Sequence, residues 1–299
     1  MNPIFLIGTL GLVAFLYWAA YQSAKALKSK TIEIQGNLLL SIPEFIFKLI
    51  LLGICFGLAN SLSVENLTRV INWPPRQIPG TLGTDNILNN LTNSVVIVNI
   101  VVGVIIGVVV AFVVNVVSTL AIRVWGKRIY APELMKSLIP SNQLEWGLIL
   151  VPLLLAVAVE EMLFRALLIG GFSTSVPAAL TSEIAGMTIA WGQILPWCLV
   201  IASSLLFGLM HSPQGSLGII LTGLVGMVFG AVFLLTQSLF TVVVAHFTVN
   251  LLQIIRAKED IAWFERLERG EPAWQSRPKA NVVENEIKTP AVETTEPLT

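Results

Sequence analysis

The chain has 299 residues, of which 55% are hydrophobic and 12% charged, and its mean hydropathy is +0.80. Soluble domains carry about 25% charged residues, so this composition excludes an ordinary soluble domain and predicts a polytopic membrane protein. Eighteen Lys and Arg balance eighteen Asp and Glu, which argues against a basic protein that binds nucleic acid.

Seven apolar segments are long enough to be candidate membrane spans. About twenty apolar residues in a row are expected to be helical in lipid, because a helix satisfies its own backbone hydrogen bonds there. This holds even for the third segment, which is rich in Val and Ile. We therefore expect an all-α, polytopic transmembrane bundle with spans at residues 4–21, 45–62, 95–122, 148–169, 195–210, 215–235 and 238–255.

The connections between the spans differ in character. Residues 63–94 are polar and predict a loop. Residues 170–192 are less hydrophobic than the spans and include Pro177 and Glu183, so we expect a loop or an interfacial helix there. Beyond residue 257 a short amphipathic piece at 263–267 is followed by polar sequence, which is typical of a disordered tail.

The positions of Lys and Arg predict the orientation. Basic residues follow spans one, three and seven, whereas the segments after spans two and four hold only Arg69 and Arg76. By the positive-inside rule the N-terminus lies outside and the C-terminus in the cytoplasm. We expect a multi-pass protein of a prokaryotic plasma membrane. It divides into an N-terminal membrane region (1–143), a four-span domain (144–256) and a cytoplasmic tail (257–299).

The fourth span carries three ionisable residues, Glu160, Glu161 and Arg165. Each such group costs roughly 2.5–3.5 kcal/mol at mid-bilayer depth, so the three are expected to face the protein interior. Glu161 and Arg165 are four residues apart and can pair on one helical face. Glu160 projects about 100° away from Glu161 and points elsewhere.

The two histidines of the chain lie in the same C-terminal half. Phe207 and His211 are four residues apart in span five, and His246 and Asn250 are four apart in span seven. Three spans thus each present a polar face, and burial of these faces predicts that they turn toward one another. The expected cluster contains Glu160, Glu161, Arg165, His211, His246 and Asn250.

Such a cluster has two catalytic interpretations. A carboxylate beside an imidazole can activate water as a general base, and a second imidazole with a carboxamide can stabilise an oxyanion. These are the parts of a peptide-bond hydrolase. Alternatively, Glu160, His211 and His246 could bind catalytic zinc and leave an open position. Taken singly, each residue also has a structural interpretation, such as an intrahelical ion pair or, for Phe207, packing.

The polar residues form three motifs in chain order: Glu160-Glu161-x-x-x-Arg165, Phe207-x-x-x-His211 and His246-x-x-x-Asn250. This set resembles the motifs of the CAAX protease and bacteriocin-processing family (CPBP, or Abi) of intramembrane proteases, which includes the Ras-converting endopeptidases. The resemblance covers roughly residues 144–255. It implies an α-helical membrane fold with a cavity open to the cytoplasm.

The resemblance also implies roles for individual residues. Glu160 and His211 would activate the water, and His246 with Asn250 would form the oxyanion hole. From their spacing, Glu161 and Arg165 would hold the helix and tune Glu160.

The resemblance leaves both a zinc-dependent and a metal-free mechanism open. We favour the metal-free mechanism, because Asn250 can act as an oxyanion donor but has no evident role as a zinc ligand. We therefore predict no specific cofactor, with zinc as the alternative. The expected partners are the lipid bilayer and a membrane-associated peptide or protein, as in CAAX-type C-terminal processing.

Two other classes of function use similar residues. A non-catalytic scaffold or immunity-type protein could bind peptide in the same pocket, although it would be free to lose a motif. A transporter or proton relay also uses buried Glu and His, but such proteins often carry internal repeats, and the two halves of this chain show no clear repeat. An intramembrane endopeptidase therefore remains the preferred prediction.

Overall fold

The computed structural model describes residues 2–29, 36–62, 88–125, 133–174, 180–184 and 187–270. Within these residues seven helical segments are long and apolar enough to cross a membrane, which confirms the predicted seven-span, all-α architecture. The helices that build them are α1 (Pro3–Lys28), α2 (Ile42–Asn60), α4 (Leu88–Trp125), the continuous run α6 (Gln143–Leu148), α7 (Leu150–Glu161), η3 (Met162–Gly171) and α8 (Phe172–Thr174), then α9 (Trp191–Met210), α10 (Gly215–Thr236) and α11 (Leu239–Glu268). Three short helices accompany them: η1 (Leu38–Leu40), α5 (Glu133–Lys136) and η4 (Ser212–Gln214).

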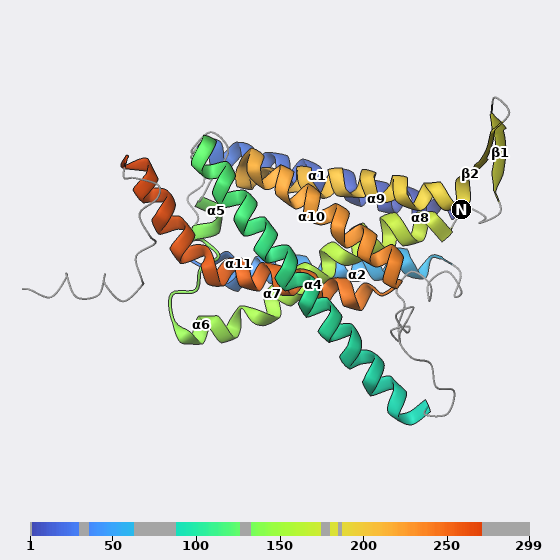
Figure 1. Cartoon of the computed structure of the whole chain (residues 1–299), viewed down its shortest axis with the longest axis horizontal. Coiled ribbons are helices and arrows are strands. Elements are labelled where there is room, and N and C mark those ends of the chain that lie inside the picture. Colours follow the sequence, from blue (N-terminus) through green and yellow to red (C-terminus); the bar gives the residue numbers. More distant parts are fainter. Residues whose placement is uncertain are drawn as a thin grey trace, which may run out of the picture.

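Figure 1 shows the arrangement of the spans. Helices α1, α9 and α10 run alongside one another, and α4 crosses the bundle diagonally over α11. The N-terminus and the end of α11 lie at opposite ends of the bundle. This placement agrees with an odd number of spans.

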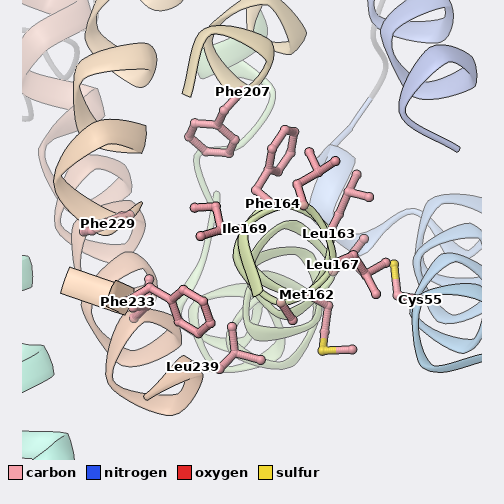
Figure 2. Packing of buried hydrophobic residues seen from close by; sticks show 14 of the residues in the cluster. Cys55, Met162, Leu163, Phe164, Leu167, Ile169, Phe207, Phe229, Phe233 and Leu239 are labelled. Carbon is pink, nitrogen blue, oxygen red and sulfur yellow. The ribbon is translucent and has the colours of Figure 1, made fainter. Parts of the chain in front are cut away.

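The π-helix η3 lies at the centre of the fold. Nine of its ten residues are buried, and Figure 2 shows that its apolar side chains are surrounded by Phe207 of α9, Phe229 and Phe233 of α10 and Cys55 of α2. π-Helical turns are rare and are frequent at functional sites. The segment follows directly after Glu161, so the fourth span changes its helical geometry at the acidic pair.

Glycines bring α9 and α10 into close contact. A Cβ atom at Gly226 would lie 3.2 Å from Ser204 Cα, and one at Gly230 would lie 2.8 Å from Val200 Cγ1. Small residues allow membrane helices to approach in this way, since van der Waals packing replaces the hydrophobic effect in lipid. This contact places α10 directly beside the helix that ends at His211.

The segment after the fourth span differs from the expected loop or interfacial helix. Residues Thr181–Ile184 (β1) and Met187–Ala190 (β2) form an antiparallel hairpin, which projects beyond the bundle at the end where the N-terminus lies (Figure 1). The two strands read Thr-Ser-Glu-Ile and Met-Thr-Ile-Ala, and four of their eight residues are β-branched Thr or Ile, which favours strand.

The C-terminal region is more ordered near its start than expected. Helix α11 continues to Glu268 instead of ending near residue 256. Trp263 and Phe264 are buried against Ile122 and Leu217, and this burial stabilises the extension. The amphipathic piece expected at 263–267 is therefore the end of α11. The rest of the expected tail, residues 271–299, lies outside the described residues.

The α9–α10 contact predicts a matched pair of stability effects. A Cβ at Gly208 would lie 2.5 Å from the carbonyl oxygen of Ile219, so Gly208→Ala should destabilise the protein by about 1–3 kcal/mol. Nothing lies within 4 Å of a Cβ at Gly57 on α2, so Gly57→Ala should leave stability unchanged or slightly raised. Thermal unfolding in detergent measures both. Equal midpoints for the two variants would contradict the packing.

Candidate active site

Glu161 and Arg165 form a fully buried ion pair. Nε of Arg165 lies 3.1 Å from Oε2 of Glu161, and the two side chains are 1% and 0% exposed. The contact is an ion pair rather than a well-aligned hydrogen bond. The pair has the i, i+4 spacing that the sequence predicted, although Arg165 itself belongs to the π-helix η3.

Aromatic rings enclose the guanidinium of Arg165. Its central carbon lies 4.8 Å from the ring centre of Phe207, 5.7 Å from that of Phe229 and 6.0 Å from that of Phe164. Rings at such distances attract a cation through their quadrupoles. Nη2 also donates a hydrogen bond to the carbonyl oxygen of Gly226 at 3.3 Å. A charge inside the membrane is thus surrounded by groups that compensate it.

His246 contacts both carboxylates. Its Nδ1 lies 2.6 Å from Oε1 of Glu161, and its Nε2 lies 3.5 Å from Oε2 of Glu160. An ionised carboxylate only accepts hydrogen bonds, so we assign the proton on Nδ1 as the donor to Glu161. This bond orients the ring and directs Nε2 toward Glu160.

The two adjacent glutamates lie in different environments. The side chain of Glu160 is 32% exposed, whereas that of Glu161 is 0% exposed. Oε2 of Glu160 is the buried oxygen, 3.5 Å from Nε2 of His246, so the exposed part of this side chain lies elsewhere on it. Glu160 is therefore the carboxylate that can meet water or a ligand, while Glu161 is occupied by Arg165 and His246.

His211 lies at the C-terminal end of α9. Its Nδ1 is 2.8 Å from the carbonyl oxygen of Phe207, so Nδ1–H is the donor and Nε2 carries the lone pair in the neutral ring. The ring of Phe207 lies 4.6 Å from the ring of His211 and 5.8 Å from that of His246, measured between centres. Phe207 therefore packs against both imidazoles. The structure records no direct contact between His211 and Glu160.

Asn250 lies one turn after His246 on α11 and is half-buried. Among the described residues its side chain has no hydrogen-bond partner. A carboxamide on the same helix and one turn from His246 has donors to offer to a ligand.

The positions of Glu160, His211 and His246 bear on the zinc site that the sequence left open. Within the described part of the chain, no group of three His, Cys, Asp or Glu side chains lies close enough together to hold an ion. The ring nitrogens themselves suit a metal ligand: Nδ1 of His246 contacts Glu161 and Nδ1 of His211 contacts a backbone carbonyl, and histidines that bind a metal through Nε2 make such bonds through Nδ1.

One part of the chain matches a known protein family. Residues 142–252 match the family model of the Rce1-like type II CAAX prenyl endopeptidases. This Rce1-like segment runs from the start of α6 to the middle of α11, contains all seven predicted site residues, and confirms the resemblance that the motifs indicated. No curated protein and no solved structure matches the chain.

The sequence did not indicate some of the residues that surround Arg165 in the Rce1-like segment. Phe164 and Phe229 flank Arg165, and Gly226 supplies its carbonyl acceptor. The glycine series in span six predicted close approach of helices but not a hydrogen bond to an arginine. No sequence signal indicated the π-helix, because hydropathy does not distinguish a π-helical turn from an α-helical one.

The buried pair predicts a large effect on stability. Arg165→Met leaves Glu161 buried with only His246 as partner and should cost about 3–5 kcal/mol. The partly exposed pair Glu44–Lys48, with side chains 38% and 17% exposed, has the same i, i+4 spacing at 3.3 Å, and Lys48→Met should cost about 1 kcal/mol. Thermal unfolding compares the two variants. Adding Glu161→Gln to Arg165→Met should recover part of the loss, and similar losses for Arg165→Met and Lys48→Met would refute the pairing.

Proposed function

We propose that the protein is an intramembrane endopeptidase that uses a water activated by glutamate and histidine. The observation that carries the proposal is the contrast between the two glutamates, within a segment that matches a peptidase family. The side chain of Glu160 is partly exposed, whereas that of Glu161 is buried and holds His246. A carboxylate that acts as general base must lie within hydrogen-bond reach of the water that it deprotonates.

In the first step Glu160 takes a proton from a water that attacks the carbonyl carbon of the scissile peptide bond. Nε2 of His211 assists by accepting a hydrogen bond from that water or from the protonated Glu160. General-base groups of this kind contribute roughly 10²–10⁴-fold to the rate. The half-buried positions of both side chains are compatible with this role.

The oxyanion that forms is stabilised by donors from α11. Nε2 of His246 is directed toward the side on which Glu160 lies, and the carboxamide of Asn250 follows one turn later. Glu161 holds His246 through Nδ1–H and fixes the ring; when Nε2 also carries a proton, that N–H is a donor to the oxyanion. The tetrahedral intermediate then collapses, the C–N bond breaks, and the proton taken by Glu160 passes to the leaving amine.

The substrate proposed for this site is a membrane-associated peptide or protein that is cut near its C-terminus, as the name of the matching family suggests. Purified protein in detergent should cleave members of a panel of prenylated and unmodified peptides. The panel separates recognition of a lipid anchor from recognition of peptide alone.

Variants of the site test the mechanism. Glu160→Gln should lower kcat by about 10²–10⁴-fold with unchanged thermal stability, and His211→Ala should also abolish most cleavage. Asn250→Ala should lower kcat by about 10²–10³-fold. Glu183→Gln, at an exposed carboxylate on β1, is the matched control and should cleave as the wild type does.

Three outcomes would change the conclusion. Wild-type activity in Glu160→Gln refutes the role of this residue. One zinc per chain by elemental analysis, lost in His211→Ala, would keep the peptidase and overturn the metal-free mechanism. Functional complementation by both inactive variants would favour a peptide-binding scaffold.

The proposed orientation places the N-terminus outside and the C-terminus in the cytoplasm of a prokaryotic cell. Lys25 near the end of α1 and Arg123 at the end of α4 would then face the cytoplasm. A cysteine introduced at Ser29 should react with an impermeant thiol reagent only after the cells are opened. One at Thr181 on the hairpin should react in intact cells, and the reverse pattern would invert the topology.

A further inference from the structure

Helix α4 lies outside the Rce1-like segment but packs along α11, which carries His246 and Asn250 (Figure 1). A Cβ atom at Gly103 would lie 2.8 Å from the carbonyl oxygen of Thr241. One at Gly107 would lie 2.6 Å from both the carbonyl oxygen of Ala245 and Cβ of Thr248. The two glycines, four residues apart, therefore bring the backbones of the two helices into direct contact.

The residues of α11 that meet α4 lie opposite the candidate active site. Thr241, Ala245 and Thr248 recur at intervals of three to four and share one face, while His246 and Asn250 lie at least 100° around the helix. On the active-site side, α11 contacts the fourth span through the hydrogen bond of His246 to Glu161, and Ile254 packs in one buried cluster with Ile149 and Leu153. Helix α11 is thus held between α4 and the fourth span.

Helix α4 is attached to its neighbours on both sides of these glycines. Toward one end, the hydroxyl of Thr241 donates a hydrogen bond to Oδ1 of Asn99, and both side chains are buried. Toward the other end, Ile122 is buried with Trp263, and the guanidinium of Arg123 lies 5.9 Å from the same indole. The middle of α4 cannot move away from α11 without disturbing both attachments.

We propose that α4 positions the catalytic helix: Gly103, Gly107 and Asn99 set the place of α11, and through it the place of His246 and Asn250 opposite Glu160. This inference rests on the proposed peptidase function. The three α4 residues do not touch the reacting groups, so they are positioning residues. In this proposal α4, one of the three spans that precede the Rce1-like segment, positions the residues that act in the reaction.

The test is a single added methyl group. The new Cβ in Gly107→Ala meets a backbone carbonyl, which can yield only if α11 shifts. A misplacement of about 1 Å can cost about 10²-fold in rate, so kcat for a cleaved peptide should fall by at least about tenfold while KM changes by less than about twofold. Gly53→Ala on α2, where nothing lies within 4 Å of a Cβ, is the matched control and should leave both constants unchanged.

A compensating change separates positioning from general damage. Thr248→Gly removes one of the two groups that the new methyl meets. In the Gly107→Ala background it should therefore recover part of the lost kcat, so that the two substitutions are coupled in a double-mutant cycle. Additive losses, with no recovery, would indicate a merely structural effect and overturn the inference.

Asn99→Ala keeps the proposal testable if Gly107→Ala does not fold. It adds no volume and removes the hydrogen bond between α4 and α11, while Thr241 keeps its contact with Ser238 at 3.0 Å. We expect a several-fold fall in kcat at unchanged KM. If Gly107→Ala folds and has the wild-type kcat, the inference is overturned but the proposed function is not. If Gly107→Ala does not fold, a wild-type kcat in Asn99→Ala has the same consequence. A wild-type protein that cleaves no peptide overturns the proposed function and this inference with it.

Discussion

The carboxylate of Glu161 is the group on which the arrangement of the active-site region depends. It is fully buried within a membrane span, with one oxygen 3.1 Å from Arg165 and the other 2.6 Å from Nδ1 of His246. An isolated charge in such a place is costly, and its cost is reduced only by close partners of suitable geometry. The two partners come from η3 and α11, so this one side chain couples the centre of the bundle to its last helix.

The same carboxylate explains how two neighbouring glutamates can differ in function. Because Glu161 is occupied on both oxygens, it holds its partners in place rather than reacting. The side chain of Glu160, one residue earlier, is 32% exposed and therefore within reach of water. The structure thus places a buried, paired carboxylate and a partly exposed one next to each other in the same turn of helix.

The aromatic residues complete this frame. Phe207 contacts the guanidinium of Arg165 and both imidazoles, and Phe229 lies against His246 and Arg165. Flat apolar rings fill the space between polar groups without competing for their hydrogen bonds. Glycine contacts then hold the helices close enough for these short distances, on α10 toward α9 and on α4 toward α11.

The sequence by itself determined the membrane class, the seven spans and the pairing of Glu161 with Arg165, because hydrophobic length and helical spacing are local properties of the chain. It also indicated, through three spaced motifs, which residues belong together. The tertiary structure alone decided that His246 meets Glu161, that the fourth span turns π-helical, that 181–190 form a hairpin and that α11 extends to Glu268. The physical reason is that lipid and protein interior are both apolar, so hydropathy does not mark the face on which one membrane helix contacts another.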